Sequence, residues 1–193
     1  VVLTLSFLAF TWHQTGCDFE RRSRFMGREQ WSIWMHKEYF KFSCAHFLIF
    51  PDGSKERLHG HNYQVDCEID GDLTDKGLVI DFKKAKPIVR ALCDWLDEHV
   101  VLPELHPDLH IDEVADGHRT WRYQDCRYMA PADEVILLPI NNSSAENFAS
   151  WIGREVRKRF IEEFGPTQIR KLRVCVSETS GQHGVYTYSD EEN

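Results

Sequence analysis

The strongest constraint on the fold is a segment of strict alternation, HGHNYQVDCEID, at residues 59–70. Successive side chains of a β-strand point to opposite faces, so one face would carry the odd-numbered residues His59, His61, Tyr63, Val65, Cys67 and Ile69. The aromatic segment 31–50 also alternates, and the sequence PDGS at 51–54 is a turn signal. Residues 31–70 are therefore predicted to form a long antiparallel hairpin.

Beyond the hairpin, the spacing of apolar residues changes from two to three or four, which is typical of helices. One helix is predicted from Phe82, with Asp81 as its N-cap. Pro87 either kinks this helix or lies in the first turn of its regular part. A second helix is predicted to start at Ser143, which forms a capping box with Glu146, and to run to a Gly-Pro stop.

Two further strands are predicted at 169–179 and 184–189, and the apolar run VILLPI at 135–140 is typical of a short buried strand. The order of elements is then hairpin, helix, helix, hairpin. This order indicates an α+β fold in which the helices cover one face of an antiparallel sheet.

The chain has 193 residues and a formal net charge of −8, without a long basic run. We therefore expect neither nucleic acid nor an anionic membrane as a partner. The six cysteines include no CxxC pair and are interpreted as reduced thiols, which favours a cytoplasmic location.

Residues 31–193 are interpreted as a single domain, and two regions do not fit its pattern. Residues 1–30 are interpreted as an N-terminal extension outside the fold, with a targeting peptide or a cloning remnant as the alternatives. Residues 104–134 are polar and lack a period, which predicts a long insertion.

Three histidines of the predicted hairpin form a candidate metal site. His59 and His61 share a strand face, and His46 on the neighbouring strand can supply a third ring. Three neutral imidazoles leave an open fourth position, as in catalytic zinc sites, and this ligand type favours zinc over iron. The alternative is a pair of unrelated strand histidines. A cupin motif is disfavoured because Val65 stands where a cupin carries glutamate.

Six segments, in this order, carry a resemblance to a known family: FKFSCAHF, RLHGHNYQVDCEIDG, GLVIDFKKAK, LDEH, SSAENFASWI and VSETSGQHGVY. The chain resembles the 6-pyruvoyl-tetrahydropterin synthase / 6-carboxy-tetrahydropterin synthase family from about Trp31 to Tyr188. The resemblance implies the tunnelling fold (T-fold), with two helices on one face of a four-stranded antiparallel sheet. It also implies assembly into an oligomeric barrel, a homohexamer of two trimers.

The resemblance also assigns roles to residues. The implied zinc ligands are His46, His59 and His61. Glu178 is implied to anchor the pterin ring, since a carboxylate can accept two hydrogen bonds from a flat pair of donors. The further implied substrate contacts are Ser143, Ser144 and Thr179.

The chain departs from the family at the general base. The family substrate is 7,8-dihydroneopterin triphosphate, and most members place a catalytic cysteine shortly before the HGH motif. Here no cysteine lies between Cys44, interpreted as a packing residue, and Cys67. Glu56 stands three residues before His59, as in a branch of the family that forms 6-hydroxymethyl-7,8-dihydropterin, a folate precursor. The alternative for Glu56 is an ordinary solvated turn.

A second departure affects the Asp-His proton relay that family members usually carry. Asp97 and His99 are separated here by Glu98, and we favour Asp97 with His99 as the pair. The predicted function is a zinc-dependent lyase acting on 7,8-dihydroneopterin triphosphate. The alternatives are Glu56-based side-chain cleavage on the folate route, 6-carboxy-tetrahydropterin synthesis on the queuosine route, and a pterin-binding relative without catalysis.

Overall fold

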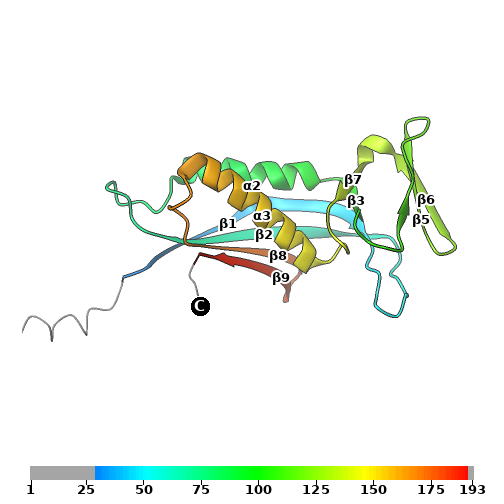
Figure 1. The fold of residues 1–193 in the computed structure, drawn as a ribbon, viewed down its shortest axis with the longest axis horizontal. Helices are drawn as coiled ribbons and strands as arrows, with labels where there is room; N and C mark the ends of the chain where they lie inside the picture. The colour runs from blue at the N-terminus through cyan, green and yellow to red at the C-terminus, as the bar shows by residue number, and fades with distance from the viewer. Residues whose placement is uncertain (1–28, 191–193) are drawn as a thin grey trace, which may run out of the picture.

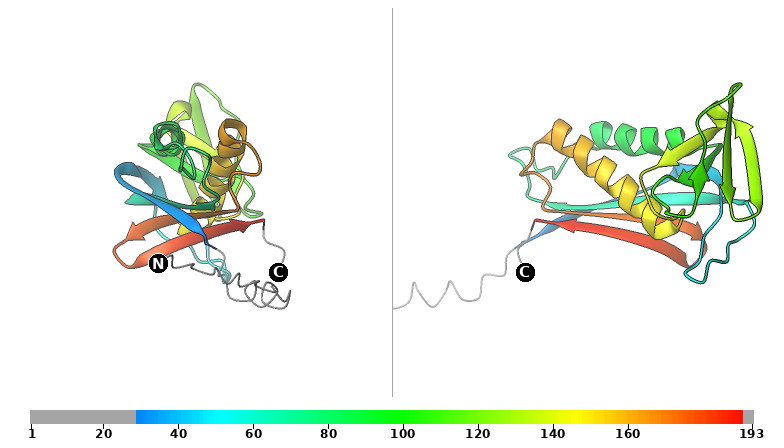
Figure 2. Two further views of the ribbon diagram at one scale, coloured as in Figure 1. Left: turned by 90° about the vertical axis from the view of Figure 1, so that its left-hand side faces the viewer. Right: turned by 45° about the vertical axis from the view of Figure 1, so that its right-hand side comes forward.

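The computed structural model describes residues 29–190, which build two layers. A six-stranded sheet forms one layer, and helices α2 (Phe82–Leu96) and α3 (Ala145–Phe164) pack together on one of its faces (Figures 1 and 2). The predicted N-terminal extension lies outside the described residues, except for residues 29 and 30. The predicted α+β architecture with helices on a single face is confirmed.

The sheet has the strand order β7-β3-β1-β2-β8-β9. The four strands expected from the sequence are antiparallel neighbours: β1 (Trp31–His46), β2 (His59–Gly71), β8 (Lys171–Thr179) and β9 (Gln182–Ser189). Two short strands, β3 (His99–Pro103) and β7 (Val135–Leu138), extend the sheet in parallel with β1. The expectation of a four-stranded, purely antiparallel sheet is therefore wrong, because these two apolar runs pair beside β1 as buried parallel strands do.

Both helices begin at a side-chain cap. The Asp81 carboxylate accepts a hydrogen bond from the Lys83 N–H at 2.8 Å, and Pro87 lies inside α2 rather than at its start. At α3 the cap is Ser144, whose Oγ accepts from the Asn147 N–H at 3.3 Å. The predicted capping box at Ser143 is wrong, because Ser143 is fully buried and its hydroxyl donates to the Val101 carbonyl at 3.3 Å.

The main core lies between the helices and the sheet. Phe148 of α3 packs edge-on against Phe42 and Tyr63, with ring centroids 6.0 and 5.2 Å apart. Near the start of α3, Gly184 of β9 approaches the helix backbone so closely that a Cβ there would lie 2.2 Å from the Ala145 carbonyl carbon. Strand β9 and the first turn of α3 are therefore in direct backbone contact.

The insertion forms a second, smaller sheet, which we call the inserted sheet. It consists of β4 (His110–Ile111), β5 (His118–Tyr123) and β6 (Cys126–Pro131), and a 3₁₀ turn at Ala132–Glu134 leads from it into β7. It stands at one end of the main sheet, beside the loop that joins β1 to β2 (Figures 1 and 2). Between them lies a second core, made of Phe47, Ile49, Leu102, Leu109, Trp121, Tyr123 and Val135.

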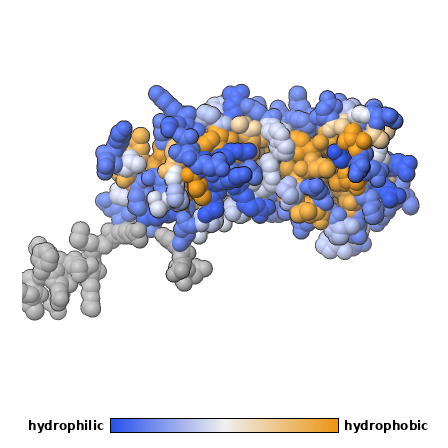
Figure 3. All heavy atoms as spheres, turned by 45° about the horizontal axis from the view of Figure 1, so that its top comes forward, coloured by the Kyte–Doolittle hydropathy of each residue, from blue (hydrophilic) through white to orange (hydrophobic). Residues whose placement is uncertain are grey.

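The surface carries exposed apolar side chains. Seen with the helices brought forward, hydrophobic residues form patches that are interrupted by hydrophilic ones (Figure 3). The most exposed large apolar side chains are Trp34 (70%), Met129 (68%) and Leu105 (61%). Among the described residues, no helix combines the length and the apolar character needed to cross a membrane.

Candidate metal centre

The end of the β1–β2 hairpin brings three histidines together. His46 is the last residue of β1 and pairs with His59, the first residue of β2, while His61 lies opposite Cys44. One nitrogen of each ring lies within 4.8 Å of the others. The side-chain exposures are 0% for His46, 37% for His59 and 26% for His61, so the cluster is closed on one side and open on the other. The alternation of the sequence correctly predicted that these side chains converge.

Backbone carbonyls orient two of the rings. The Nδ1 of His46 lies 2.9 Å from the Ser143 carbonyl oxygen, and the Nδ1 of His59 lies 2.7 Å from the Arg57 carbonyl oxygen. A carbonyl can only accept, so each Nδ1 carries the proton and each Nε2 keeps a free lone pair. Burial is the main cause that lowers the pKa of His46, which keeps the ring in the neutral form that binds metals.

These donors fit a metal ion. The Nε2 atoms of His59 and His61 lie only 2.9 Å apart, and the His59 Nε2 has no proton to place between them. Two nitrogen atoms this close are stabilised by a cation or a proton that both can bind. Neutral imidazole nitrogens converging from three sides are the ligand set of an open zinc site. The sequence-based expectation of a three-histidine metal group is thus met by the geometry of its donors.

Glu178 lies at the edge of this centre. Its Oε1 lies 3.5 Å from the Nε2 atoms of both His46 and His61. The same oxygen accepts a hydrogen bond from the Tyr63 hydroxyl at 3.0 Å, and that hydroxyl lies 2.9 Å from the His46 Nε2. Burial is the main cause that raises the pKa of Tyr63, so the phenol stays protonated and can donate. The carboxylate is therefore held next to the nitrogens of the histidine cluster, and it also lines a pocket with Asn62 and Thr179.

Tyr63 was not singled out by sequence reasoning as a site residue. A signal was present, because Tyr63 lies two residues after His61 and therefore shares its strand face. Its burial at 0% exposure and its stacking on Phe42, at 4.9 Å between centroids, give it a structural role as well. Tyr63 links the main core to the histidine cluster.

Glu56 also reaches the centre. Its Oε2 accepts a hydrogen bond from the Leu48 N–H at 3.1 Å and lies 4.0 Å from the Nε2 of His59. The Glu56 N–H donates to the Leu48 carbonyl at 3.0 Å, so the residue is fixed against the opposite side of its own loop. The carboxylate is one-third exposed, at 33%, and is open to a ligand bound at the histidines.

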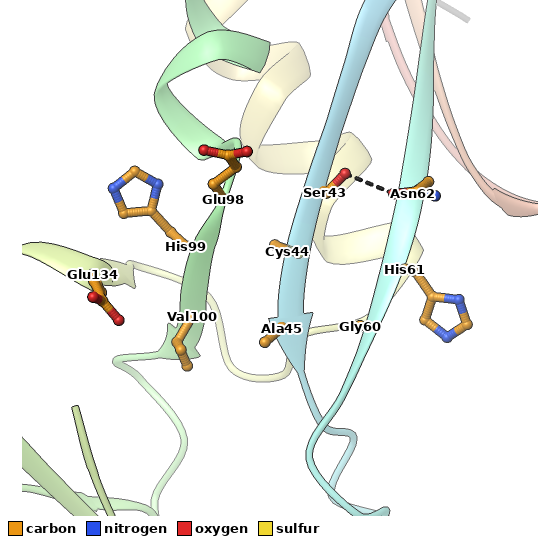
Figure 4. Close-up of a pocket in the computed structure, with 10 residues that line it drawn as sticks. All are labelled: Ser43, Cys44, Ala45, Gly60, His61, Asn62, Glu98, His99, Val100 and Glu134. Atoms are coloured by element: carbon orange, nitrogen blue, oxygen red, sulfur yellow. Dashed lines mark hydrogen bonds between the residues drawn. The ribbon is translucent and has the colours of Figure 1, made fainter. Parts of the chain in front are cut away.

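Asp97 and His99 do not join the centre within one chain. The Asp97 carboxylate accepts from the Ser43 N–H at 2.6 Å, and the Nδ1 of His99 donates to the Asp97 backbone carbonyl at 2.5 Å. His61 on β2 and His99 on β3 point away from each other on the two sides of β1 (Figure 4). Both residues nevertheless border one open pocket of about 310 Å³, which extends across β1 and is also lined by Glu98. Glu98 has a left-handed φ of 60°.

The remaining candidates lie around the start of α3 and the end of β8. The Ser143 hydroxyl donates to the Val101 carbonyl, and the Ser144 hydroxyl accepts from the Asn147 N–H. Thr179 follows Glu178 and its hydroxyl donates to the Gln182 side chain at 3.0 Å. Cys44 is 4% exposed, and burial is the main cause that raises its pKa to about 12, so its thiol is protonated near neutral pH.

Comparisons with known proteins agree with this geometry. The sequence profile of 6-pyruvoyl tetrahydropterin synthase matches residues 35–189. A putative 6-carboxy-5,6,7,8-tetrahydropterin synthase from Methanocaldococcus jannaschii is 34% identical over 76% of this chain and 88% of its own length. The crystal structure of 6-pyruvoyl tetrahydropterin synthase from Plasmodium vivax has 31% identity and a TM-score of 0.78, covering 84% of this chain and 99% of that one.

Two further structures are variants of the Plasmodium vivax enzyme in which a glutamate described as a catalytic residue is replaced by alanine or by cysteine. Both align with this chain at 30% identity and a TM-score of 0.78, over 84% of this chain and 99% of the other. A hairpin bearing three convergent histidines, two helices on one face and the extent of these matches define a pterin enzyme. The chain belongs to the 6-pyruvoyl tetrahydropterin synthase family.

Proposed function

We propose that this chain is a zinc-dependent enzyme that acts on 7,8-dihydroneopterin triphosphate, with Glu56 as the general base in place of the usual cysteine. The observation that carries the proposal is the position of the Glu56 carboxylate, 4.0 Å from the Nε2 of His59 and fixed by the Leu48 N–H. A base must lie within reach of the proton it removes, and this carboxylate lies beside the position of a substrate held at the histidines.

The three histidines would hold the ion through their Nε2 atoms. When bound, zinc would bind the side-chain hydroxyls of the pterin and lower their pKa. Glu56 would then remove a proton from the side chain, while Glu178 and Thr179, which line one pocket, would hold the pterin ring. Ser143 contributes through its carbonyl, which sets the tautomer of His46, and Ser144 contributes by capping α3.

Asp97 and His99 have a place in this proposal only if copies of the chain assemble. Because His99 points away from His61 in this chain, the pair would serve the centre of a neighbouring copy (Figure 4). The homohexamer of two trimers is the assembly that the resemblance implies. Trp34, exposed at 70% on the sheet face away from the helices, offers apolar surface that a partner copy would cover. A cytoplasmic location remains part of the proposal.

The proposed product is 6-hydroxymethyl-7,8-dihydropterin. This route belongs to the branch of the family that the resemblance at Glu56 implies. The catalytic glutamate named for the Plasmodium vivax 6-pyruvoyltetrahydropterin synthase supports a glutamate as the base. The second candidate is 6-carboxy-tetrahydropterin synthesis, which is favoured by the names of curated relatives such as the Methanocaldococcus jannaschii protein. Release of 6-pyruvoyl-tetrahydropterin would mean that a group other than Glu56 does the work of the cysteine.

The test combines product identification with one substitution. Zinc-loaded protein is incubated with 7,8-dihydroneopterin triphosphate, and the pterin is identified by mass. We expect hydroxymethyl-dihydropterin, and we expect Glu56→Gln to lower kcat by about 10²–10⁴-fold because the amide cannot accept the proton. Bound zinc, measured by elemental analysis, should stay unchanged in this variant, because Glu56 is not among the three ligands.

Glu68→Gln is the matched control, since Glu68 lies on β2 but pairs with Arg173 on the face away from the helices. Its kcat should stay within about twofold of the parent. Unchanged turnover in Glu56→Gln would remove Glu56 from the mechanism. Tight pterin binding without any product would support the non-catalytic relative instead.

A further inference from the structure

The loop that carries Glu56 is held at its tip by the inserted sheet. This β1–β2 loop, residues 47–58, turns at Gly53, whose φ is +82°. The Gly53 carbonyl accepts two hydrogen bonds from the β5–β6 hairpin, one from the hydroxyl of Tyr123 at the end of β5 and one from the Gln124 Nε2 in the turn, each 2.9 Å long. Two donors on a single carbonyl fix the position of the tip.

The base of the same loop is held by stacked aromatic rings. Phe47 stacks on Tyr128, with 5.9 Å between centroids and 22° between planes, and Tyr128 stacks on Trp121 at 5.5 Å and 11°. The Lys55 ammonium lies 5.1 Å from the Phe47 ring and 5.4 Å from the Tyr128 ring. The same ammonium donates to the Glu56 carbonyl at 2.9 Å, so the stack is connected directly to Glu56.

A third contact comes from the segment before α3. The Asn142 side chain accepts from the Ile49 N–H at 3.2 Å and donates to the Ile49 carbonyl at 2.8 Å. It therefore pairs with the loop as a neighbouring strand would. The loop is fixed at its base, its middle and its tip, and two of these contacts come from the inserted sheet.

We propose that the inserted sheet is a positioning element for Glu56, acting through Tyr123, Gln124 and the stack of Tyr128 on Phe47. This inference rests on the proposed function of Glu56. Apart from the inserted sheet, the loop is held by its own hydrogen bonds and by Asn142 near its start. A displacement of about 1 Å at a catalytic group can lower a rate by about 10²-fold. The inserted sheet supplies the restraint without touching the histidines.

The test uses a double substitution, Tyr123→Phe with Gln124→Gly. Phenylalanine keeps the buried ring of Tyr123, and glycine accepts the left-handed φ of 49° at residue 124. Hydrogen exchange of the zinc-loaded protein should rise by about tenfold or more in peptides covering the β1–β2 loop. Turnover should fall by about tenfold or more in kcat with KM within about twofold, because the loss lies in positioning.

Combining these substitutions with Glu56→Gln separates positioning from general damage. If the inserted sheet acts through Glu56, the double substitution causes no further fall in kcat once Glu56 is replaced. An equal fall in both backgrounds, or unchanged exchange in the loop, would overturn the proposal. Met129→Ala, at an exposed position of the same sheet, is the control and should change neither readout. If the parent protein shows no turnover, the proposed function fails and hydrogen exchange alone decides whether the inserted sheet fixes the loop.

Discussion

The main core and the second core differ in how their aromatic side chains are held. In the main core, Phe42 and Tyr63 stack on each other and Phe148 meets both edge-on, between a long helix and two long strands. In the second core, Trp121, Tyr128 and Phe47 lie nearly parallel, between short strands and a loop. Strand β4 has only 2 residues, and the buried Trp121 Nε1 has no hydrogen-bond partner among the described residues.

This difference indicates that the main core stabilises the fold, whereas the second core positions the β1–β2 loop. Long elements carry many backbone hydrogen bonds, so the main core should open only in global unfolding. The second core depends on side-chain packing and leaves a buried donor unsatisfied, which costs free energy. It should open locally, and the loop that carries Glu56 should open with it.

The largest expected effect comes from the main core. Phe148→Ala should lower the free energy of unfolding by about 3–5 kcal/mol, because it removes a fully buried ring and leaves a cavity. Urea denaturation with an unchanged m-value would measure the loss. Phe82→Ala, at a side chain that is 39% exposed, is the control and should cost much less. Equal losses would remove the distinction between core and surface at these positions.

The second core should respond differently. Trp121→Ala should lower the free energy of local opening by about 2–3 kcal/mol, because the stack on Tyr128 is lost at the edge of the molecule. Hydrogen exchange should rise in the inserted sheet and the β1–β2 loop, but not in β2 or β8. A rise of the same size across β2 and β8 would show that the two cores unfold as one unit.

The smallest expected loss of stability comes from the cap at the start of α3. Ser144→Ala should cost about 1 kcal/mol in unfolding free energy, because it removes the helix cap. Ser150→Ala, within the same helix, is the control and should be close to neutral. Equal free energies of unfolding for Ser144→Ala and Ser150→Ala would show that the Ser144 hydroxyl does not stabilise the start of α3.

The sequence predicted the main layers because their periods are unambiguous. The alternation of residues 59–70 and the spacing of apolar residues after Asp81 each point to a single element type. The inserted sheet was not predicted, because its polar residues hide the alternation of β5. A turn signal was present at Asp116-Gly117, where both residues have positive φ values of 51° and 75°, as two-residue hairpins require.

The candidate site was predictable to the extent that strands set its geometry. His46, His59 and His61 follow from alternation and pairing, whereas Glu178 at the end of β8 was assigned by the resemblance alone. The partners of Asp97 and His99 did not follow, because Glu98 adopts a left-handed conformation that turns the chain between them. A single inserted residue at a helix end therefore decides where the next two side chains point.

The tryptophans give each region its own optical reporter. Trp95 of α2 and Trp151 of α3 stack at 5.4 Å and 26°, on the helix layer, whereas Trp121 lies in the second core. Indoles so close couple their electronic transitions, so the Trp95–Trp151 pair adds to the near-ultraviolet circular dichroism only while the helices stay packed. Emission from Trp121 depends instead on the stack beneath the β1–β2 loop. Near-ultraviolet circular dichroism can thus follow the packing of the helices without any added label, and emission can follow the second core in a variant that keeps Trp121 as its single tryptophan.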